Sequence, residues 1–265
     1  MKLRIALPGL VALAAARAEA QVDYRNLDDD RPVPVEDAYP VERYAFELLA
    51  AWRVERLGLG RVRYLVVPEL EYGITSGTSL GVKVPLALTT QAGSSDYGLA
   101  GLRVFALVNL TTERPSLPGL GLRLDAGLPW GALAGSGAAA MVQALATRSF
   151  GRNRVHLNAG AALGSPGAGG AAEAIPRWRA GGAVDRTLLR SSTLLLLALT
   201  MEQEARGRGV EIAGAVGCRR QVTPTLVLDA GVSYAVVRDA RPVAGITLGL
   251  SHAFGIAALL PGGGK

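Results

Sequence analysis

The sequence predicts an all-β fold: an antiparallel, up-and-down transmembrane β-barrel of about twelve strands. Apolar and polar residues alternate with a period of two along most of the chain after residue 43, the pattern of strands whose two faces meet different surroundings. These stretches are roughly ten to thirteen residues long, enough for a tilted strand to cross a bilayer, whereas soluble strands average about five or six residues. Short and longer connections also alternate, which is typical of outer-membrane barrels.

The composition is that of a folded protein with one large β domain. Of 265 residues, 49% are hydrophobic, 19% are charged and 34 are Gly, which is too apolar for a disordered chain. Only 5% are aromatic, which is few for an outer-membrane protein. The basic residues are scattered along the strands and not clustered, so the sequence predicts no nucleic-acid partner.

Residues 1–20 have the features of a cleaved secretory signal peptide. Lys2 and Arg4 precede the apolar run Ile5–Ala16, and Ala18 and Ala20 supply the small residues of a cleavage site before Gln21. The run is too short to span a bilayer comfortably as a helix. Cleavage would change 28 basic and 22 acidic residues to 25 and 21, so the formal net charge would fall from +6 to +4.

Residues 21–42 predict a periplasmic N-terminal arm without regular structure. This segment is acidic, contains several Pro residues and has no hydrophobic period. Asp28–Asp30 lacks the alternating oxygen ligands, Gly and distal Glu of a calcium loop. We therefore expect a solvated acidic patch there and no metal site.

Residues 61–89 predict the clearest hairpin, with strands at 62–74 and 80–88. In both strands the apolar residues share one parity, and charged or small residues hold the other. Thr75–Thr78 is a polar turn that contains Gly. The other predicted strands are 44–55, 102–110, 120–128, 138–147, 155–161, 177–185, 195–204, 210–219, 226–234 and 246–254. The predicted barrel therefore spans 43–254, and 255–265 form a C-terminal tail.

Loop lengths set the predicted orientation of the barrel. With the N-terminus in the periplasm, the connections at 75–78, 112–118, 151–153, 189–192 and 223–225 are periplasmic and short. Most of the outer connections are longer, among them 91–98, 129–137, 164–176 and 237–242.

If the apolar parity faces lipid, the opposite parity lines a polar lumen. The predicted lumen-lining residues carry both signs of charge: Arg61, Arg63, Glu69, Glu71, Lys83, Arg103, Arg123, Asp125, Arg177, Arg179, Asp185, Glu211, Arg219 and Asp229. Such residues either line a pathway for a solute or fill the barrel with salt bridges, because buried charges are costly unless paired or hydrated. Both interpretations stay open from the sequence.

Four segments carry a resemblance to a known family. These are DAYPVERY at 37–44, PELEYGIT at 68–75, SDYGL at 95–99 and TPTLVLDAG at 223–231. They resemble the family of outer-membrane proteins associated with the meta-cleavage pathway of phenol degradation, and the resemblance extends from Asp37 to Phe254. It implies a β-barrel in the outer membrane of a Gram-negative cell that passes small, often aromatic or apolar, molecules. The resemblance identifies no functional site residues in this sequence.

The sequence predicts neither an enzyme nor a cofactor or metal protein. Only His156 and His252 could act as a histidine base, one with inward and one with outward parity, and no G-x-S-x-G elbow occurs. The single cysteine, Cys218, excludes an internal disulfide and a thiolate metal cluster.

The predicted function is a passive outer-membrane channel for small molecules, with selection by the width and charge of the lumen. Its partners are then outer-membrane lipid, a small-molecule solute and, as the class implies, the barrel-assembly machinery. One alternative is a non-conducting structural or adhesive barrel. The other is a soluble exported β-sandwich.

Overall fold

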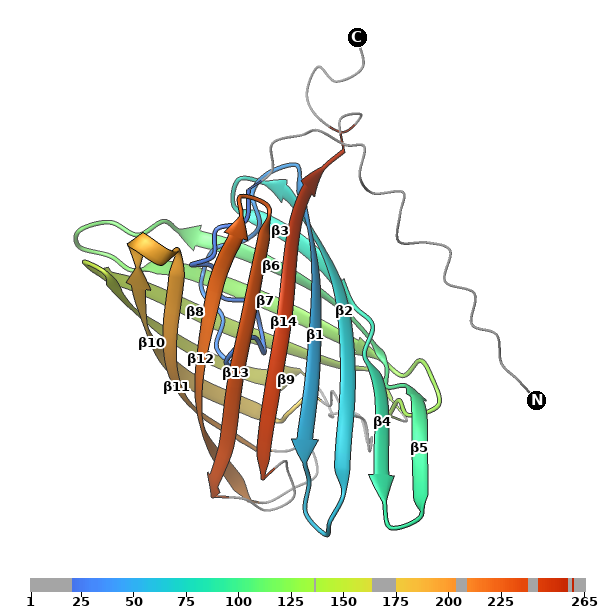
Figure 1. Ribbon diagram of the computed structural model, residues 1–265. Helices are drawn as coiled ribbons and strands as arrows, with labels where there is room; N and C mark the ends of the chain where they lie inside the picture. The colour runs from blue at the N-terminus through green and yellow to red at the C-terminus, as the bar shows by residue number, and fades with distance from the viewer. Residues whose placement is uncertain are drawn as a thin grey trace.

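The computed structural model contains one closed antiparallel β-barrel (Figure 1). It describes residues 21–135, 137–163, 175–203, 209–237, 243–256 and 259. The predicted signal peptide and most of the predicted tail lie outside the described residues. Within these residues, no helix is long and apolar enough to cross a membrane.

Fourteen β-segments and one 3₁₀ turn make up the described structure. They are β1 (Ala45–Arg56), β2 (Val62–Thr75), β3 (Thr78–Lys83), β4 (Leu86–Gln91), β5 (Ser94–Leu99), β6 (Leu102–Thr111), β7 (Gly119–Leu128), β8 (Ala139–Phe150), β9 (Asn153–Leu163), β10 (Trp178–Leu188), η2 (Leu189–Ser191), β11 (Thr193–Gln203), β12 (Val210–Thr223), β13 (Leu226–Val237) and β14 (Ala244–Gly255).

The barrel has twelve strands, as the alternation predicts. Neighbouring strands pair in sequence order from β6 to β14, and β1 closes the barrel by pairing with both β14 and β2. Two strands are each split into two segments. β3 and β4 both pair with β2, while β6 pairs with β3 and β5 pairs with β4. The closed barrel excludes the soluble β-sandwich.

The split in the wall lies at Pro85, between β3 and β4. Proline has no backbone N–H to donate, so a ladder is commonly interrupted there. The Ala100 N–H instead donates to the Pro85 carbonyl at 2.9 Å. Beyond this point β4 and β5 continue as a hairpin next to β2 (Figure 1), and the Leu133 N–H reaches the Leu99 carbonyl at 2.9 Å.

The predicted loop at 91–98 is wrong, because most of it forms β5. The hairpin turn comprises only Ala92 and Gly93, with Gly93 at φ +87°, a conformation that favours glycine. Ser94–Tyr97 are exposed in succession, so this strand has no alternating apolar face for the sequence to reveal.

The outer surface is apolar, as the predicted parity requires. Leu195, Leu197 and Leu199 on β11 are 45%, 61% and 52% exposed, and the same parity holds on the other strands. Phe46, Tyr72 and Phe254 stack where β2, β1 and β14 adjoin, with ring centroids 4.4 Å and 5.4 Å apart. An apolar belt on a closed barrel is the surface of a membrane-spanning protein.

The two ends of the barrel differ in their connections. At the end that we call the short-turn end, the strands are joined through 76–77, 112–118, 151–152, 189–192 and 224–225. At the opposite, long-loop end, the connections at 129–138 and 164–177 are the longest, 204–209 and 238–243 have six residues each, and 57–61 and 92–93 are short. The short set matches the predicted one, and its periplasmic placement stays a prediction.

Candidate functional site: a lumen occupied by the N-terminal arm

Residues 21–44, which we call the arm, lie inside the barrel (Figure 1). The arm enters at the short-turn end, where the Val22 N–H donates to the Pro224 carbonyl at 3.0 Å. It descends to the level of Lys83, then returns to the same end, where the Tyr44 N–H donates to the Gly73 carbonyl at 2.7 Å before β1 begins. The sequence predicted a periplasmic arm, and the structure shows that this segment packs against the inner wall of the barrel.

Asp29 is the central ion of the arm, and the prediction of a solvated acidic patch is wrong for it. Asp29 is only 4% exposed. Four cations from different strands surround its carboxylate: Arg179 at 3.2 Å, Lys83 at 3.4 Å, Arg103 at 3.6 Å and Arg123 at 3.8 Å. Burial by itself raises the pKa of Asp29, but Lys83 and these arginines hold that pKa well below its ordinary range.

A second ion cluster fixes the neighbouring part of the arm. Arg31 bonds to Asp28 at 2.6 Å within the arm and reaches Asp229 on β13 at 3.3 Å. It also donates to the Ser251 hydroxyl at 2.6 Å. From β12, Arg219 contacts Asp28 at 2.8 Å. Because these charges pair with each other, their burial is tolerated while the arm is docked.

Glu36 joins the returning half of the arm to the opposite wall. Arg123 on β7 contacts its carboxylate at 2.6 Å and also binds Asp125 at 2.9 Å. Asn158 on β9 accepts from the Glu36 N–H and donates to the Glu36 carbonyl, both at 2.8 Å. This pair of bonds holds the arm backbone in the way a neighbouring strand would.

A hydroxyl, an imidazole and a carboxylate lie in a row beside the arm. The Thr147 hydroxyl is 3.0 Å from His156 Nδ1, and His156 Nε2 is 2.8 Å from Asp185. This order resembles a catalytic triad. However, the Ala38 N–H donates to the same hydroxyl at 3.2 Å, and His156 and Thr147 are completely buried. In this conformation the row binds the arm, and no substrate can reach the hydroxyl.

Glycines on the inner wall allow the arm to lie directly against the strands. A Cβ at Gly231 would overlap the Pro32 carbonyl, and one at Gly73 would overlap the Glu42 carbonyl. At both sites the glycine contacts the backbone of the arm, which cannot move aside as a flexible side chain can. A larger residue at either position would therefore push the arm away from the wall.

Apolar contacts complete the docking and reveal inward-facing residues that the sequence analysis missed. Leu27, Val33 and Val35 of the arm are at most 2% exposed. They pack against Ala183, Leu194, Leu196, Ala198 and Ala215 on β10, β11 and β12. Residues 194–199 form an unbroken apolar run, so parity there gave no signal for the inner face.

Most of the predicted lumen-lining residues face the interior. Nine are buried there: Glu69, Glu71, Lys83, Arg103, Arg123, Asp125, Asp185, Arg219 and Asp229. Arg179 contacts the arm, Arg63 pairs with Glu55 at 2.5 Å, and Glu211 has inward parity on β12. Arg61 and Arg177 instead precede β2 and β10 at the long-loop end, so they are not part of the strand wall.

The inner wall is apolar where the strand is split. Ala51, Leu65, Val67, Ala87 and Ala100 form a buried cluster. Leu133, from the connection between β7 and β8, packs against this cluster. The sequence predicted a charged lumen, whereas this side of the lumen is apolar.

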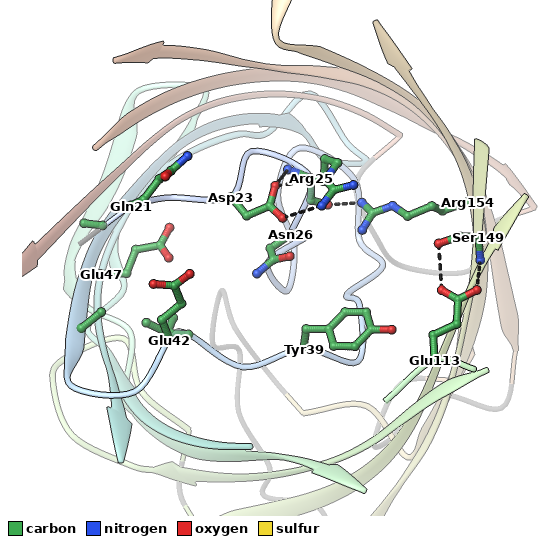
Figure 2. Close-up of a pocket in the computed structure, with 13 residues that line it drawn as sticks. Gln21, Asp23, Arg25, Asn26, Tyr39, Glu42, Glu47, Glu113, Ser149 and Arg154 are labelled. Carbon is green, nitrogen blue, oxygen red and sulfur yellow. Dashed lines mark hydrogen bonds and ion pairs between the residues drawn. The ribbon is translucent and has the colours of Figure 1, made fainter. Parts of the chain in front are cut away.

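An open vestibule of about 390 Å³ lies at the short-turn end, between the arm and the wall. Figure 2 shows Glu42 and Glu47 directed toward the same region, with Gln21 beside Glu47 and Tyr39 farther along the arm. Glu113 lies on the far side, where its carboxylate accepts from the Ser149 hydroxyl at 2.8 Å. Within the described segments, no group of three or more His, Cys, Asp or Glu is placed to hold a metal ion.

Comparison with known proteins identifies the fold. No protein-family model and no curated protein matches the chain. Among solved structures, the COG4313 outer membrane channel from Pseudomonas putida F1 is similar, with a TM-score of 0.65 and 13% identity over 86% of this chain and 100% of that one. The chain has the fold of outer-membrane β-barrels. The KdgM porin, solved with disordered oligogalacturonate, also matches, with a TM-score of 0.51 and 12% identity over 78% of this chain and 99% of that one.

Proposed function

We propose that this protein is a passive outer-membrane channel for small apolar or aromatic molecules. In this proposal the signal peptide is cleaved, the barrel-assembly machinery inserts the barrel, and its partners are membrane lipid and the solute. The docked arm represents the closed state of the channel. Solute would diffuse down its gradient without energy coupling.

The observation that carries the proposal is the apolar inner wall formed by Ala51, Leu65, Val67, Ala87 and Ala100. Interiors of water-filled barrels are polar, whereas here one side of the lumen offers methyl groups and leucine side chains. An apolar solute gains free energy when it leaves water for such a surface. A sugar would lose its hydrogen bonds to water there, which costs free energy.

Two further points support the proposal. The similar structure from Pseudomonas putida F1 is an outer membrane channel. The four segments that resemble the phenol meta-pathway family point to aromatic solutes, because that family is associated with phenol degradation.

The non-conducting barrel remains the second candidate, and the ion-paired arm is the observation that favours it. Asp29 alone meets four wall cations, as a permanent filling would. A channel requires that the arm can leave its site while the barrel stays folded.

Uptake into intact cells tests the solute class. Cells that express the protein should take up a labelled monoaromatic hydrocarbon faster than cells without it, and should gain no comparable uptake of a labelled sugar. Val67→Thr replaces an inner-wall methyl by a hydroxyl of equal size and should slow aromatic uptake by roughly three- to tenfold.

Val66→Thr is the matched control, because Val66 is the neighbouring residue on the opposite face of β2. It should leave uptake unchanged. Equal effects of the two variants, or faster sugar than hydrocarbon uptake, would contradict an apolar pathway along this wall.

A further inference from the structure

The vestibule contains a buried carboxylate, one oxygen of which has no hydrogen-bond partner among the described residues. Glu47 on β1 is 8% exposed, and its Oε1 is buried with no hydrogen-bond partner among the described residues. Its side chain lines the vestibule, as does that of Glu42 (Figure 2). A buried carboxylate oxygen without a partner costs free energy, so a positively charged group is expected beside it.

The arginines of the vestibule are engaged elsewhere. Arg25 binds Asp23 at 3.1 Å. Arg154 binds Asp185 at 2.8 Å and lies 3.6 Å from Asp37. Arg219 and Arg31 also act on Glu47, but both are bonded to Asp28. A further cation beside the Glu47 Oε1 would come from another part of the chain or from outside.

Gln21 lines the vestibule together with Glu47, and its position is fixed by its neighbour Val22. Val22 is held by the Pro224 carbonyl at 3.0 Å, and it packs against Ala45 and Ala253. Glu47 is two residues beyond Ala45 on the same inward face, about 7 Å along the strand. Gln21 and Glu47 accordingly line the same vestibule.

We propose that Glu47, with Glu42 beside it, binds the α-ammonium group that signal cleavage creates at Gln21. The proposal rests on the predicted cleavage between Ala20 and Gln21 and is independent of what the barrel transports. A free α-amino group has an ordinary pKa of about 7.7–8.0, so it is charged at neutral pH. In an uncleaved chain this nitrogen is a neutral amide, so the arm gains its last ionic contact only after processing.

The test combines intact mass with titration of the α-amine. The purified, folded protein should have the mass of a chain that begins with unmodified Gln21. Reductive ¹³C-methylation keeps the amine charged and labels it together with Lys83 and Lys265, the only lysines after residue 20. In Glu47→Gln, the NMR titration midpoint of the labelled α-amine should fall by about one pH unit, which is a tenfold loss of proton affinity.

Two variants make the result specific to this ion pair. One Ala inserted between Ala20 and Gln21 moves the amine away and should lower the midpoint as much as Glu47→Gln, with no further fall when both changes are combined. Glu113→Gln removes a vestibule carboxylate that already has a partner in Ser149, and it should leave the midpoint unchanged.

Three results would overturn the proposal. The first is a mature chain that begins elsewhere, and the second is a Gln21 cyclised to pyroglutamate, which has no ammonium group. The third is the same midpoint in the native protein and in a folded Glu47→Gln variant.

Discussion

The Asp29 carboxylate pairs with four cations of the barrel wall. Asp29→Asn would leave Lys83, Arg103, Arg123 and Arg179 around a neutral side chain. Removing one partner of a buried ionic group costs about 3–5 kcal/mol, so hydrogen exchange of arm amides 28–37 should accelerate by about a hundredfold or more. Mass spectrometry of the exchanged arm peptide measures this.

Asp30→Asn is the control for Asp29→Asn. Asp30 pairs with Arg179 at 3.4 Å, and its side chain is 23% exposed. Its φ of +67° also suits asparagine. Arm exchange in this variant should change by less than tenfold. Equal acceleration in the two variants would contradict the central role of Asp29.

Asp37 should make docking of the arm depend on pH. Burial raises the pKa of Asp37 to about 6, although Arg154 and His156 oppose the shift. The docked arm therefore retains a proton that an undocked arm releases near pH 4, so docking weakens as the pH rises through about 6. Asp29 adds no change in this window, because its pKa lies well below 3.8.

The expected effect between pH 4 and 7 is on the order of 3 kcal/mol, from a shift of about two pH units. It appears as faster arm exchange at pH 7 after correction for intrinsic rates. Asp37→Asn keeps an acceptor for the Tyr39 N–H, which lies 3.1 Å from the Asp37 carboxylate, and should show a smaller dependence on pH. The dependence that is left comes from Glu36, whose pKa burial also raises. A wild-type arm that docks more tightly at pH 7 would reverse the sign and refute the argument.

Residue-scale features of the site were only partly predictable. Parity assigned Lys83, Arg123 and Asp185 to the interior, because a strand fixes which face each side chain occupies. The partner of these cations could not be predicted. Asp29 lies 54 residues from Lys83 and 150 from Arg179, and no local pattern in 21–44 encodes that contact.

At the scale of elements, the fit between the arm and the wall depends on glycine. Gly231→Ala would drive a methyl group into the Pro32 carbonyl. We expect the barrel to assemble normally and the arm to undock, since the three atoms nearest to the added methyl group all belong to Pro32 of the arm. Faster trypsin cleavage after Arg25, measured by mass spectrometry, reports the undocked arm.

Gly214→Ala is the matched control, because a Cβ there meets no atom within 4 Å. It lies on β12 and should leave cleavage of the arm unchanged. If Gly231→Ala is cleaved no faster than Gly214→Ala, the arm does not depend on this close contact.

The elements themselves follow from sequence wherever one face is apolar and the other is not. That condition holds for β2, β7 and β13, and their bounds match the predicted strands within a few residues. It fails for β5, whose residues 94–97 are all exposed, and for the inward Leu194 and Leu196, where both faces of the strand are apolar. Parity is informative only when the two environments differ.

At the scale of the whole molecule, the outer belt predicts a depth-dependent cost for a charge. Leu197→Arg places a cation near the middle of β11, where it should cost about 2–4 kcal/mol and reduce assembly. Leu188→Arg lies at the end of β10, where the cost should be about 0–1 kcal/mol. The heat-modifiable folded fraction on gels compares the two, and equal fractions would place the membrane elsewhere.

The molecule as a whole is a membrane barrel whose lumen is occupied by its own N-terminal arm, which we propose closes it. Single-channel conductance in planar bilayers tests this claim most directly, by comparing the full-length protein with one that lacks residues 22–42. The full-length protein should show small or rare current steps, and the shortened protein should show frequent steps that are several-fold larger. Equal conductance of the two folded proteins would contradict closure by the arm.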